Sequence, residues 1–155
     1  MFNKIFYNKT VLVTGHTGFK GSWLSIWLNY LGAKGVGGSI DEGSKPSNFL
    51  VSEVSNIVND RKLDIRDANA IRVLVEDVQP DFVFHLAAQA LVRQSYENPL
   101  ETMMVNAIGT TNILDALRVL DKKVVAVMIT SDKAYDNIEW VWGYRETDRL
   151  GGRDP

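Results

Sequence analysis

Three glycines at a regular spacing are the residues of this sequence that most directly suggest chemistry. Gly15, Gly18 and Gly21 fall in the stretch VTGHTGFKG, between an apolar run and a segment with helical periodicity. At such a strand-to-helix turn the first glycine allows the tight turn, the second lets the backbone approach phosphate oxygens, and the third lets the helix pack on the strand. Free N–H groups and the positive end of the helix dipole attract an anion there. The spacing therefore predicts a site for the pyrophosphate of a dinucleotide, with an ordinary structural turn as the alternative.

Charged side chains near this turn each have two interpretations. Lys20, in the first helical turn, either adds a cation beside the pyrophosphate or is a solvated lysine. Asp41 follows the third glycine by 20 residues, so it is placed to bind the ribose hydroxyls and would favour NAD over NADP, or it is an ordinary loop acid. Because Lys45 lies nearby, NADP remains the alternative cofactor to NAD. Asp64, just before Ile65, is placed where a loop can reach the adenine, or it is a turn aspartate.

The elements that must position these residues alternate between strand and helix. Short apolar runs predict strands over 10–14, 35–40, 57–58, 82–86 and 124–129. Helical patterns follow the glycines as far as Gly32 and recur over 67–78 and 99–120. The first helix is expected to bury a wide apolar stripe, formed by Trp23, Leu24, Ile26, Trp27, Leu28 and Leu31. The apolar side of the long helix over 99–120 is expected to consist of Met103, Val105, Ile108, Ile113, Leu114, Leu117 and Leu120.

The strands are continuous apolar runs rather than alternating ones, and the fifth is apolar on both faces. This pattern is typical of a parallel sheet that helices cover on both sides. We therefore expect an α/β protein with a Rossmann-like, doubly wound parallel sheet.

Composition places few further limits on function. The chain has 155 residues, 45% of them hydrophobic, which is enough for one domain with a core. Its net charge of −2 gives no electrostatic reason to expect nucleic acid or an anionic membrane as a partner. There is no cysteine and no apolar run of the roughly 18 residues that a membrane span needs. The opening MFNKIFYNKT is too short and polar for a signal peptide, so we expect a cytoplasmic protein.

Several stretches together resemble the extended short-chain dehydrogenases that act on nucleotide sugars. They are VTGHTGFKG at the first turn, DIRD at 64–67, HLAAQ at 85–89, VNAIGT at 105–110 and TSDK at 130–133. The longer stretches GHTGFKGSWLSIWL, QALVRQSY, TSDKAYDN and EWVWGYRETD resemble the CDP-glucose 4,6-dehydratases within that family. The resemblance covers essentially the whole chain.

This resemblance implies an NAD-dependent lyase reaction on CDP-glucose. Bound NAD would accept a hydride from C4 of the glucose, water would leave across C5 and C6, and the hydride would return to C6. The product would be CDP-4-keto-6-deoxyglucose, a precursor of deoxysugars in bacterial surface polysaccharides such as lipopolysaccharide. The full-length family is expected to form homodimers. Two alternatives remain: another nucleotide sugar such as GDP-mannose or dTDP-glucose, or a non-catalytic NAD-binding half-domain.

The resemblance also assigns cofactor contacts by position. It implies pyrophosphate binding by Gly15, Gly18, Phe19, Lys20 and Gly21. It implies adenine contacts by Asp64 and Ile65, and a wall beside the ribose and nicotinamide formed by Leu86, Ala87 and Ala88. Asn106 matches an asparagine on a helix of the active site; by itself it would be a helix residue with a local hydrogen bond.

Catalytic groups are implied at the end of the fifth strand, where Ser131, Asp132 and Lys133 follow one another. In the family, Asp132 would be the acid that protonates the departing C6 hydroxyl. Dehydratases for dTDP-glucose have a glutamate at the position of Lys133, so this lysine supports a CDP-sugar. Without the resemblance, we would interpret Asp132 and Lys133 as an ordinary surface ion pair. No metal site is expected.

The family's Tyr-x-x-x-Lys motif is the expected feature that the sequence lacks at the right place. On a helix this spacing puts the phenol and the ammonium on one face, and the ammonium and cofactor lower the pKa of the phenol. The match Tyr30 with Lys34 straddles Gly32, where the first helix should end. We therefore expect residues 1–155 to be an incomplete NAD-binding domain, truncated after about the fifth strand, without the sugar-nucleotide domain and inactive alone.

Overall fold

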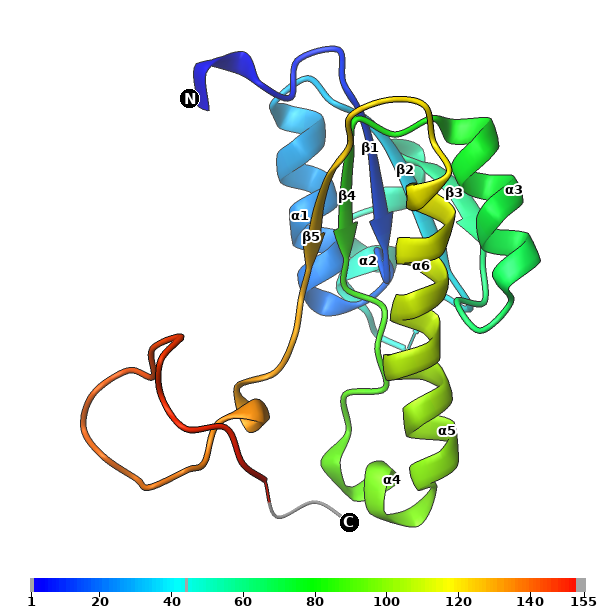
Figure 1. Ribbon diagram of the computed structural model, residues 1–155. Coiled ribbons are helices and arrows are strands. Elements are labelled where there is room, and N and C mark those ends of the chain that lie inside the picture. The colour runs from blue at the N-terminus through cyan, green and yellow to red at the C-terminus, as the bar shows by residue number, and fades with distance from the viewer. Residues whose placement is uncertain (1, 44, 153–155) are drawn as a thin grey trace.

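The centre of the molecule is a five-stranded sheet in the order β3-β2-β1-β4-β5, in which every neighbouring pair is parallel. The computed structural model describes residues 2–43 and 45–152. The strands are β1 (Thr10–Thr14), β2 (Lys34–Ser39), β3 (Asn59–Lys62), β4 (Phe82–His85) and β5 (Val125–Met128). The chain adds β2 and β3 on one side of β1 and then returns to add β4 and β5 on the other side, as in a doubly wound Rossmann-like fold (Figure 1). The predicted fold class is therefore confirmed.

Helices cover the middle of the sheet on both faces, with α1 on one side and α3 and α6 on the other (Figure 1). The helices are α1 (Phe19–Tyr30), α2 (Asn48–Val51), α3 (Ala68–Val78), α4 (Val92–Glu97), α5 (Pro99–Met103) and α6 (Gly109–Arg118). A π-helical turn, Met104–Ile108, joins α5 to α6. Short 3-10 turns lie at Phe2–Lys4, Val54–Asn56 and Asp132–Ala134. None of the helices in the described ranges has the length and apolar content that crossing a bilayer requires.

The core has two parts because successive side chains of β1 point to opposite faces. Leu12 packs with Val83 and Ile113 toward α3 and α6, while Val11 and Val13 pack toward α1. All three β1 side chains are at most 2% exposed. The central strand is therefore the best-buried element of the described chain.

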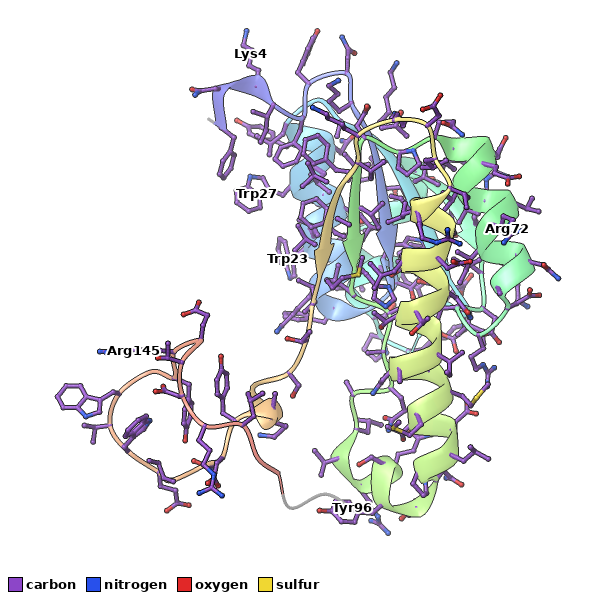
Figure 2. The ribbon with its side chains drawn as sticks, in the orientation of Figure 1. Lys4, Trp23, Trp27, Arg72, Tyr96 and Arg145 are labelled. Atoms are coloured by element: carbon purple, nitrogen blue, oxygen red, sulfur yellow. The ribbon has the colours of Figure 1, made fainter. Side chains whose placement is uncertain are left out.

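The prediction for the buried face of α1 is confirmed for Leu28 and Leu24, which pack into the core, but it is wrong for the two tryptophans. The helix buries Gly21, Ser22, Ser25 and Leu28, while Trp23 and Trp27 are 55% and 46% exposed. Both tryptophans project outward from α1 (Figure 2). The physical reason is the close approach of the helix to β1: a Cβ atom on Gly21 would collide with the Gly15 carbonyl oxygen. Only small side chains fit along that contact.

The third strand also differs from its prediction. It spans 59–62 instead of 57–58, and all of its residues are exposed. The sequence NDRK has no apolar pattern, and the strand forms because its backbone pairs with β2. Backbone hydrogen bonding at a sheet edge does not require apolar side chains, so periodicity does not reveal it.

The fifth strand is where predicted, but most of it is not buried. Val125 and Val127 are 54% and 37% exposed, against the expectation of a strand covered on both faces. The long helical run over 99–118 likewise buries Ile113 but leaves Met103, Ile108 and Leu114 between 44% and 60% exposed. Beyond β5 the chain leaves the sheet and closes a loop through a bridge between Tyr135 and Leu150 (Figure 1).

Candidate functional site

The glycine turn lies at the carboxyl end of β1, against the end of β4. Gly15 has a φ of +75°, which favours glycine, and a Cβ atom there would lie 2.7 Å from the Ala87 amide nitrogen. Gly21 has no room for a side chain beneath it either. Two of the three glycines are thus required by the packing of the turn itself. The structure brings together the predicted pyrophosphate residues 15 and 18–21 at one end of α1.

Gly18 differs from the other two glycines because it is exposed and its φ of −69° is open to any residue. It is exposed, and a Cβ atom at this position would have the Gly15 carbonyl oxygen, at 3.3 Å, as its nearest neighbour. Gly18 is the N-cap residue of α1 and has no side chain that could cap the helix. The uncapped helix N-terminus and the bare backbone in front of it fit the pyrophosphate of a dinucleotide. Phe19 and Lys20, in the first turn of α1, are exposed beside this position.

His16 is a buried residue of the turn that sequence reasoning missed. Its ring is fully buried, with Nε2 2.9 Å from Asp60 Oδ1 and Nδ1 3.1 Å from Ser39 Oγ. A carboxylate only accepts, so Nε2 donates to Asp60 and Nδ1 accepts from Ser39. Burial lowers the pKa of His16, and the neighbouring Asp60 opposes part of that shift. A Cβ on Gly37 would collide with the imidazole, and this strand glycine was the available signal.

The predicted ribose acid Asp41 lies beyond the end of β2 and is exposed. Its Oδ1 accepts a hydrogen bond of 2.9 Å from the Gly43 amide, which closes a local turn. The carboxylate is therefore held by its own loop, and ribose binding by Asp41 stays a prediction.

Asp64, predicted at the adenine, is tied to a cation that the sequence did not single out. Arg66 donates to Asp64 through Nε at 2.9 Å and Nη2 at 2.6 Å, and to Glu101 through Nη1 at 2.6 Å. The hydrogen bonds from Arg66 hold the pKa of Asp64 below its ordinary value, and Asp64 in turn raises the pKa of the guanidinium. This triad joins the loop after β3 to α5.

Ile65 is fixed from the side of α6. Its side chain is 6% exposed and lies under Gly109, where a Cβ would be 2.6 Å from its Cδ1. Asn112 donates to the carbonyl oxygens of Ile65 and Arg66 at 3.0 and 3.2 Å. The side chain of Ile65 thus belongs to the core, and its contact with the adenine stays a prediction.

The segment after β4 forms the side of the site next to Gly15. The Leu86 amide donates to the Thr14 carbonyl at 3.0 Å, which continues the pairing of β4 with β1. Leu86 and Ala87 are half-buried and Ala88 is exposed. Further on, Asn106 in the π turn holds the Gln89 backbone, accepting from its amide at 2.8 Å and donating to its carbonyl at 2.9 Å. Both polar groups of Asn106 therefore position the loop after β4.

Ser131, Asp132 and Lys133 follow β5 at the same edge of the sheet as the glycine turn, with β4 in between. The Lys133 amide donates to Ser131 Oγ at 3.1 Å. The side chain of Asp132 lies outside the part of the chain that the structure describes. The catalytic roles of the three residues stay predictions. Within the described ranges, no group of three or more His, Asp or Glu side chains is arranged to hold a metal ion.

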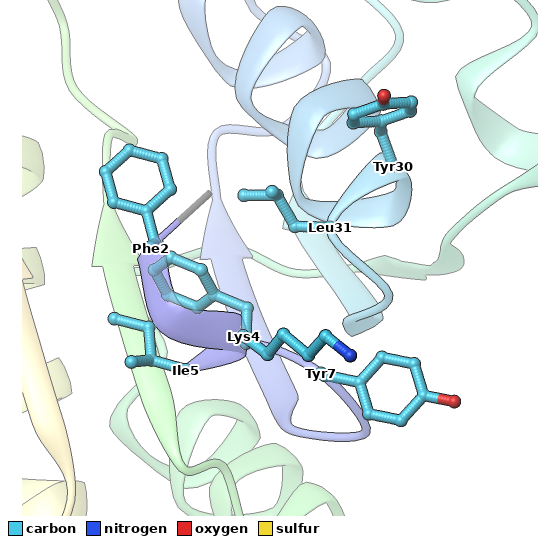
Figure 3. A pocket seen from close by; sticks show the side chains of 7 residues that line it. Phe2, Lys4, Ile5, Tyr7, Tyr30 and Leu31 are labelled. Atoms are coloured by element: carbon cyan, nitrogen blue, oxygen red, sulfur yellow. The ribbon is translucent and has the colours of Figure 1, made fainter.

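Tyr30 and Lys34 do not form a helical pair. Tyr30 is the last residue of α1 and Lys34 the first of β2, with Gly32 at a φ of +82° between them. Tyr30 instead lines a pocket of about 290 Å³ with Phe2, Lys4 and Tyr7, at the opposite end of α1 from the glycine turn (Figure 3). The pair is therefore unrelated to the candidate cofactor site.

Comparison with known proteins agrees with this geometry. A profile of the family described as GDP-mannose 4,6 dehydratase matches residues 12–155. The chain is 47% identical to the CDP-glucose 4,6-dehydratase of Salmonella typhimurium, over 100% of this chain and 44% of that protein. It is 30% identical to the GDP-mannose 4,6-dehydratase of Yersinia enterocolitica, over 95% of this chain and 41% of that protein.

A solved structure shows the same fold with a cofactor. The UDP-glucose 4-epimerase of Thermus thermophilus, in complex with NAD, superposes with a TM-score of 0.80 and 27% identity, over 94% of this chain and 45% of that one. The chain thus spans less than half the length of each of these relatives. The resemblance to the CDP-glucose 4,6-dehydratases is confirmed for the amino-terminal part of that enzyme.

Proposed function

This chain belongs to the GDP-mannose 4,6 dehydratase family, and we propose on that basis that it forms the NAD-binding part of a CDP-glucose 4,6-dehydratase. The observation that supports cofactor binding best is the glycine turn. Gly15 and Gly21 are required by packing, whereas Gly18 is left bare in front of an uncapped helix N-terminus. The backbone dihedrals at Gly18 do not require a glycine, but a phosphate that approaches the backbone does.

Each part of the proposed site has one task toward NAD. The turn, with Phe19 and Lys20, binds the pyrophosphate, and the loop around Asp64 meets the adenine. Leu86, Ala87 and Ala88 form the wall beside the nicotinamide ribose, with Asn106 behind them. Asp41 is proposed to meet the ribose hydroxyls of the adenosine. Bound NAD supplies a hydride acceptor that the twenty amino acids lack.

The proposed substrate is CDP-glucose because identity to a CDP-glucose enzyme, at 47%, exceeds that to a GDP-mannose enzyme, at 30%. Ser131, Asp132 and Lys133 stand at the carboxyl end of β5, where parallel α/β sheets place reacting groups. We assign Asp132 the delivery of a proton to the departing C6 hydroxyl. Lys133, beside it, supports the CDP-sugar over dTDP-glucose.

Titration calorimetry with NAD tests the cofactor site, with Gly18→Val as the decisive variant. A valine is compatible with the φ of −69° at Gly18, although its Cβ would lie in a tight contact, 3.3 Å from the Gly15 carbonyl oxygen, and its side chain occupies the space in front of α1. We expect the variant to stay folded, as a thermal melt would show, and to lose at least about tenfold in NAD affinity, or ~1.4 kcal/mol. Gly143→Val is the matched control, because a Cβ there meets nothing within 4 Å. A folded wild-type chain that binds no NAD contradicts the proposal.

The substrate is tested separately by adding CDP-glucose, GDP-mannose or dTDP-glucose together with NAD. The 4-keto product of a dehydratase is followed by its absorbance in base. For the chain of 155 residues we expect no turnover with any of them, because Tyr30 and Lys34 do not form the tyrosine–lysine pair. Binding should still rank CDP-glucose first in any enzyme that contains this sequence. A preference for GDP-mannose would refute the CDP-glucose assignment and leave the family unchanged.

A further inference from the structure

The second histidine of the chain, His85, is buried between three elements at the edge of the candidate site. It ends β4, is 2% exposed and makes one hydrogen bond at each ring nitrogen. Its Nδ1 lies 2.6 Å from Oγ1 of Thr14 at the end of β1. Its Nε2 lies 3.0 Å from Oγ1 of Thr110 on α6.

The direction of each hydrogen bond follows from what the two threonines do next. Thr110 Oγ1 donates to the Asn106 carbonyl at 2.7 Å, so its proton is committed and it accepts from His85 Nε2. His85 Nδ1 is then bare and accepts the hydroxyl proton of Thr14. The oxygen of Thr14 in turn lies 3.4 Å from the Ala87 amide, which donates to it. All four hydrogen bonds of this series are donated in the same direction, from the Ala87 amide toward the Asn106 carbonyl.

Both ends of the chain of hydrogen bonds reach the segment after β4. Ala87 belongs to the wall proposed for the nicotinamide ribose, and Asn106 holds the backbone of Gln89 with both of its polar atoms. A π turn carries Asn106, and such turns are frequent at functional sites. The imidazole is therefore a fixed link between the start of this segment and the helix turn that holds its end.

We propose that His85, as its Nε2–H tautomer, is a positioning residue that sets the 86–89 segment for the nicotinamide half of the cofactor. The role rests on the proposed NAD site, although the hydrogen-bond chain itself does not. Burial lowers the pKa of His85, which agrees with a neutral ring that donates on one side and accepts on the other. A doubly protonated ring would leave the Thr14 hydroxyl proton without its acceptor, Nδ1 of His85.

The tautomer is measurable in the chain without any ligand. Nitrogen-15 NMR of the imidazole separates a bare nitrogen from one that carries a proton. We expect a bare Nδ1 and a protonated Nε2 for His85 near pH 7, and loss of that preference in Thr110→Val. Protonation of Nδ1 would overturn the proposal even if the chain binds NAD.

The positioning role is tested with two neighbouring threonines that differ in one contact. Thr110 and Thr111 both donate to the carbonyl four residues earlier on the helix, Thr111 to Ala107 at 2.9 Å, but only Thr110 touches His85. We expect Thr110→Val to lower the affinity for NAD about tenfold, as loss of one buried hydrogen bond does. The affinity for ADP should stay within about twofold of the wild-type value. Thr111→Val should change neither. Equal losses for NAD and ADP, or equal effects of the two variants, would overturn it.

Two further measurements keep the test decisive if Thr110→Val folds poorly or the wild type fails to bind NAD. His85→Gln offers one acceptor and one donor and should retain NAD affinity, whereas His85→Phe should not. Amide exchange at Gln89, which Asn106 protects, should speed up in His85→Phe and stay slow in His85→Gln. Failure of NAD binding in the wild type would refute the proposed function alone, and unchanged exchange at Gln89 would refute the positioning role alone.

Discussion

β1 and β5 are short apolar strands of the same parallel sheet, yet their surroundings are opposite. In β1, Val11, Leu12 and Val13 are at most 2% exposed, whereas in β5 Val125 is 54% exposed. β1 pairs with β2 and β4 and lies under helices on both faces; β5 pairs with β4 alone in the described chain. An apolar sequence therefore allows a strand to be buried, and the position of the strand in the sheet decides whether it is.

The strongest test of this comparison removes a side chain from each strand. Leu12→Ala should lower the free energy of unfolding by about 2–5 kcal/mol, because it leaves a cavity among Val83, Ile113 and their neighbours. Val125→Ala should cost about 0.5 kcal/mol or less. Urea unfolding monitored by circular dichroism measures both. Similar losses would show that β5 is as well covered as β1.

Acidification is expected to act at the carboxyl end of the sheet, where both histidines of the chain are buried. The pKa values of His16 and His85 lie below 6.5 in the folded chain, so the unfolded chain binds more protons below that pH. The contribution of the two neutral histidines to the free energy of unfolding is therefore fully present above about pH 6.5. It is lost as the pH falls toward the lowered pKa values, by at most about 1.4 kcal/mol per pH unit for each histidine.

Thermal melts between pH 7.5 and 5 measure how stability depends on pH. The variant His85→Gln should remove the part of this pH dependence that His85 contributes. The groups that face His85 are the uncharged Thr14 and Thr110, whereas His16 faces Asp60. The share of His85 should thus be free of an opposing carboxylate. A slope that does not change in His85→Gln would contradict a buried neutral ring.

Helix α3, which packs on the same face of the sheet as α6, begins at an N-cap residue, Asp67. This cap can be removed without changing a core side chain. Asp67 Oδ1 accepts from the amides of Asn69 and Ala70, both at 3.0 Å. Asp67→Ala should cost about 1 kcal/mol of stability in the same urea assay. Asp77→Ala, on the exposed side of that helix, should cost no more than about 0.5 kcal/mol. Equal losses would mean that the cap has no part in holding α3.

The smallest effect is expected on the outer side of α1. Trp23 is 55% exposed, and Trp23→Gln should change the free energy of unfolding by about 0.5 kcal/mol or less. Ser25→Leu, on the buried side, should cost clearly more, because Ser25 is 2% exposed against the sheet. A large loss for Trp23→Gln would show that the apolar outer side is packed after all.

The sequence predicted the elements that local patterns describe and missed those that depend on partners far along the chain. The strand TVLVT, the helix after Asp67 and the glycine turn have local signals and lie where expected. The strand at 59–62 has none, because only its pairing with β2 makes it a strand. In α1 the two tryptophans suggested the wrong face, while the small residues Gly21 and Ser25 mark the contact.

The same division holds for the candidate site. The glycines were predictable because their spacing is a local property of a turn. His16 and His85 were not, because their partners Asp60, Thr14 and Thr110 lie between 25 and 71 residues away in sequence. Arg66 lies inside the DIRD stretch, but its partner Glu101 lies 35 residues away in sequence, so the bridge becomes visible only in three dimensions.

The contact between His16 and Gly37 constrains which sequences this fold can accept. Any side chain on Gly37 would occupy the space of the imidazole, so the glycine is required by its neighbour rather than by its own backbone. The two positions should therefore vary together among homologues. Where a small residue replaces the histidine in the turn, the strand position can take a side chain, and where the histidine is kept, the glycine should be kept as well.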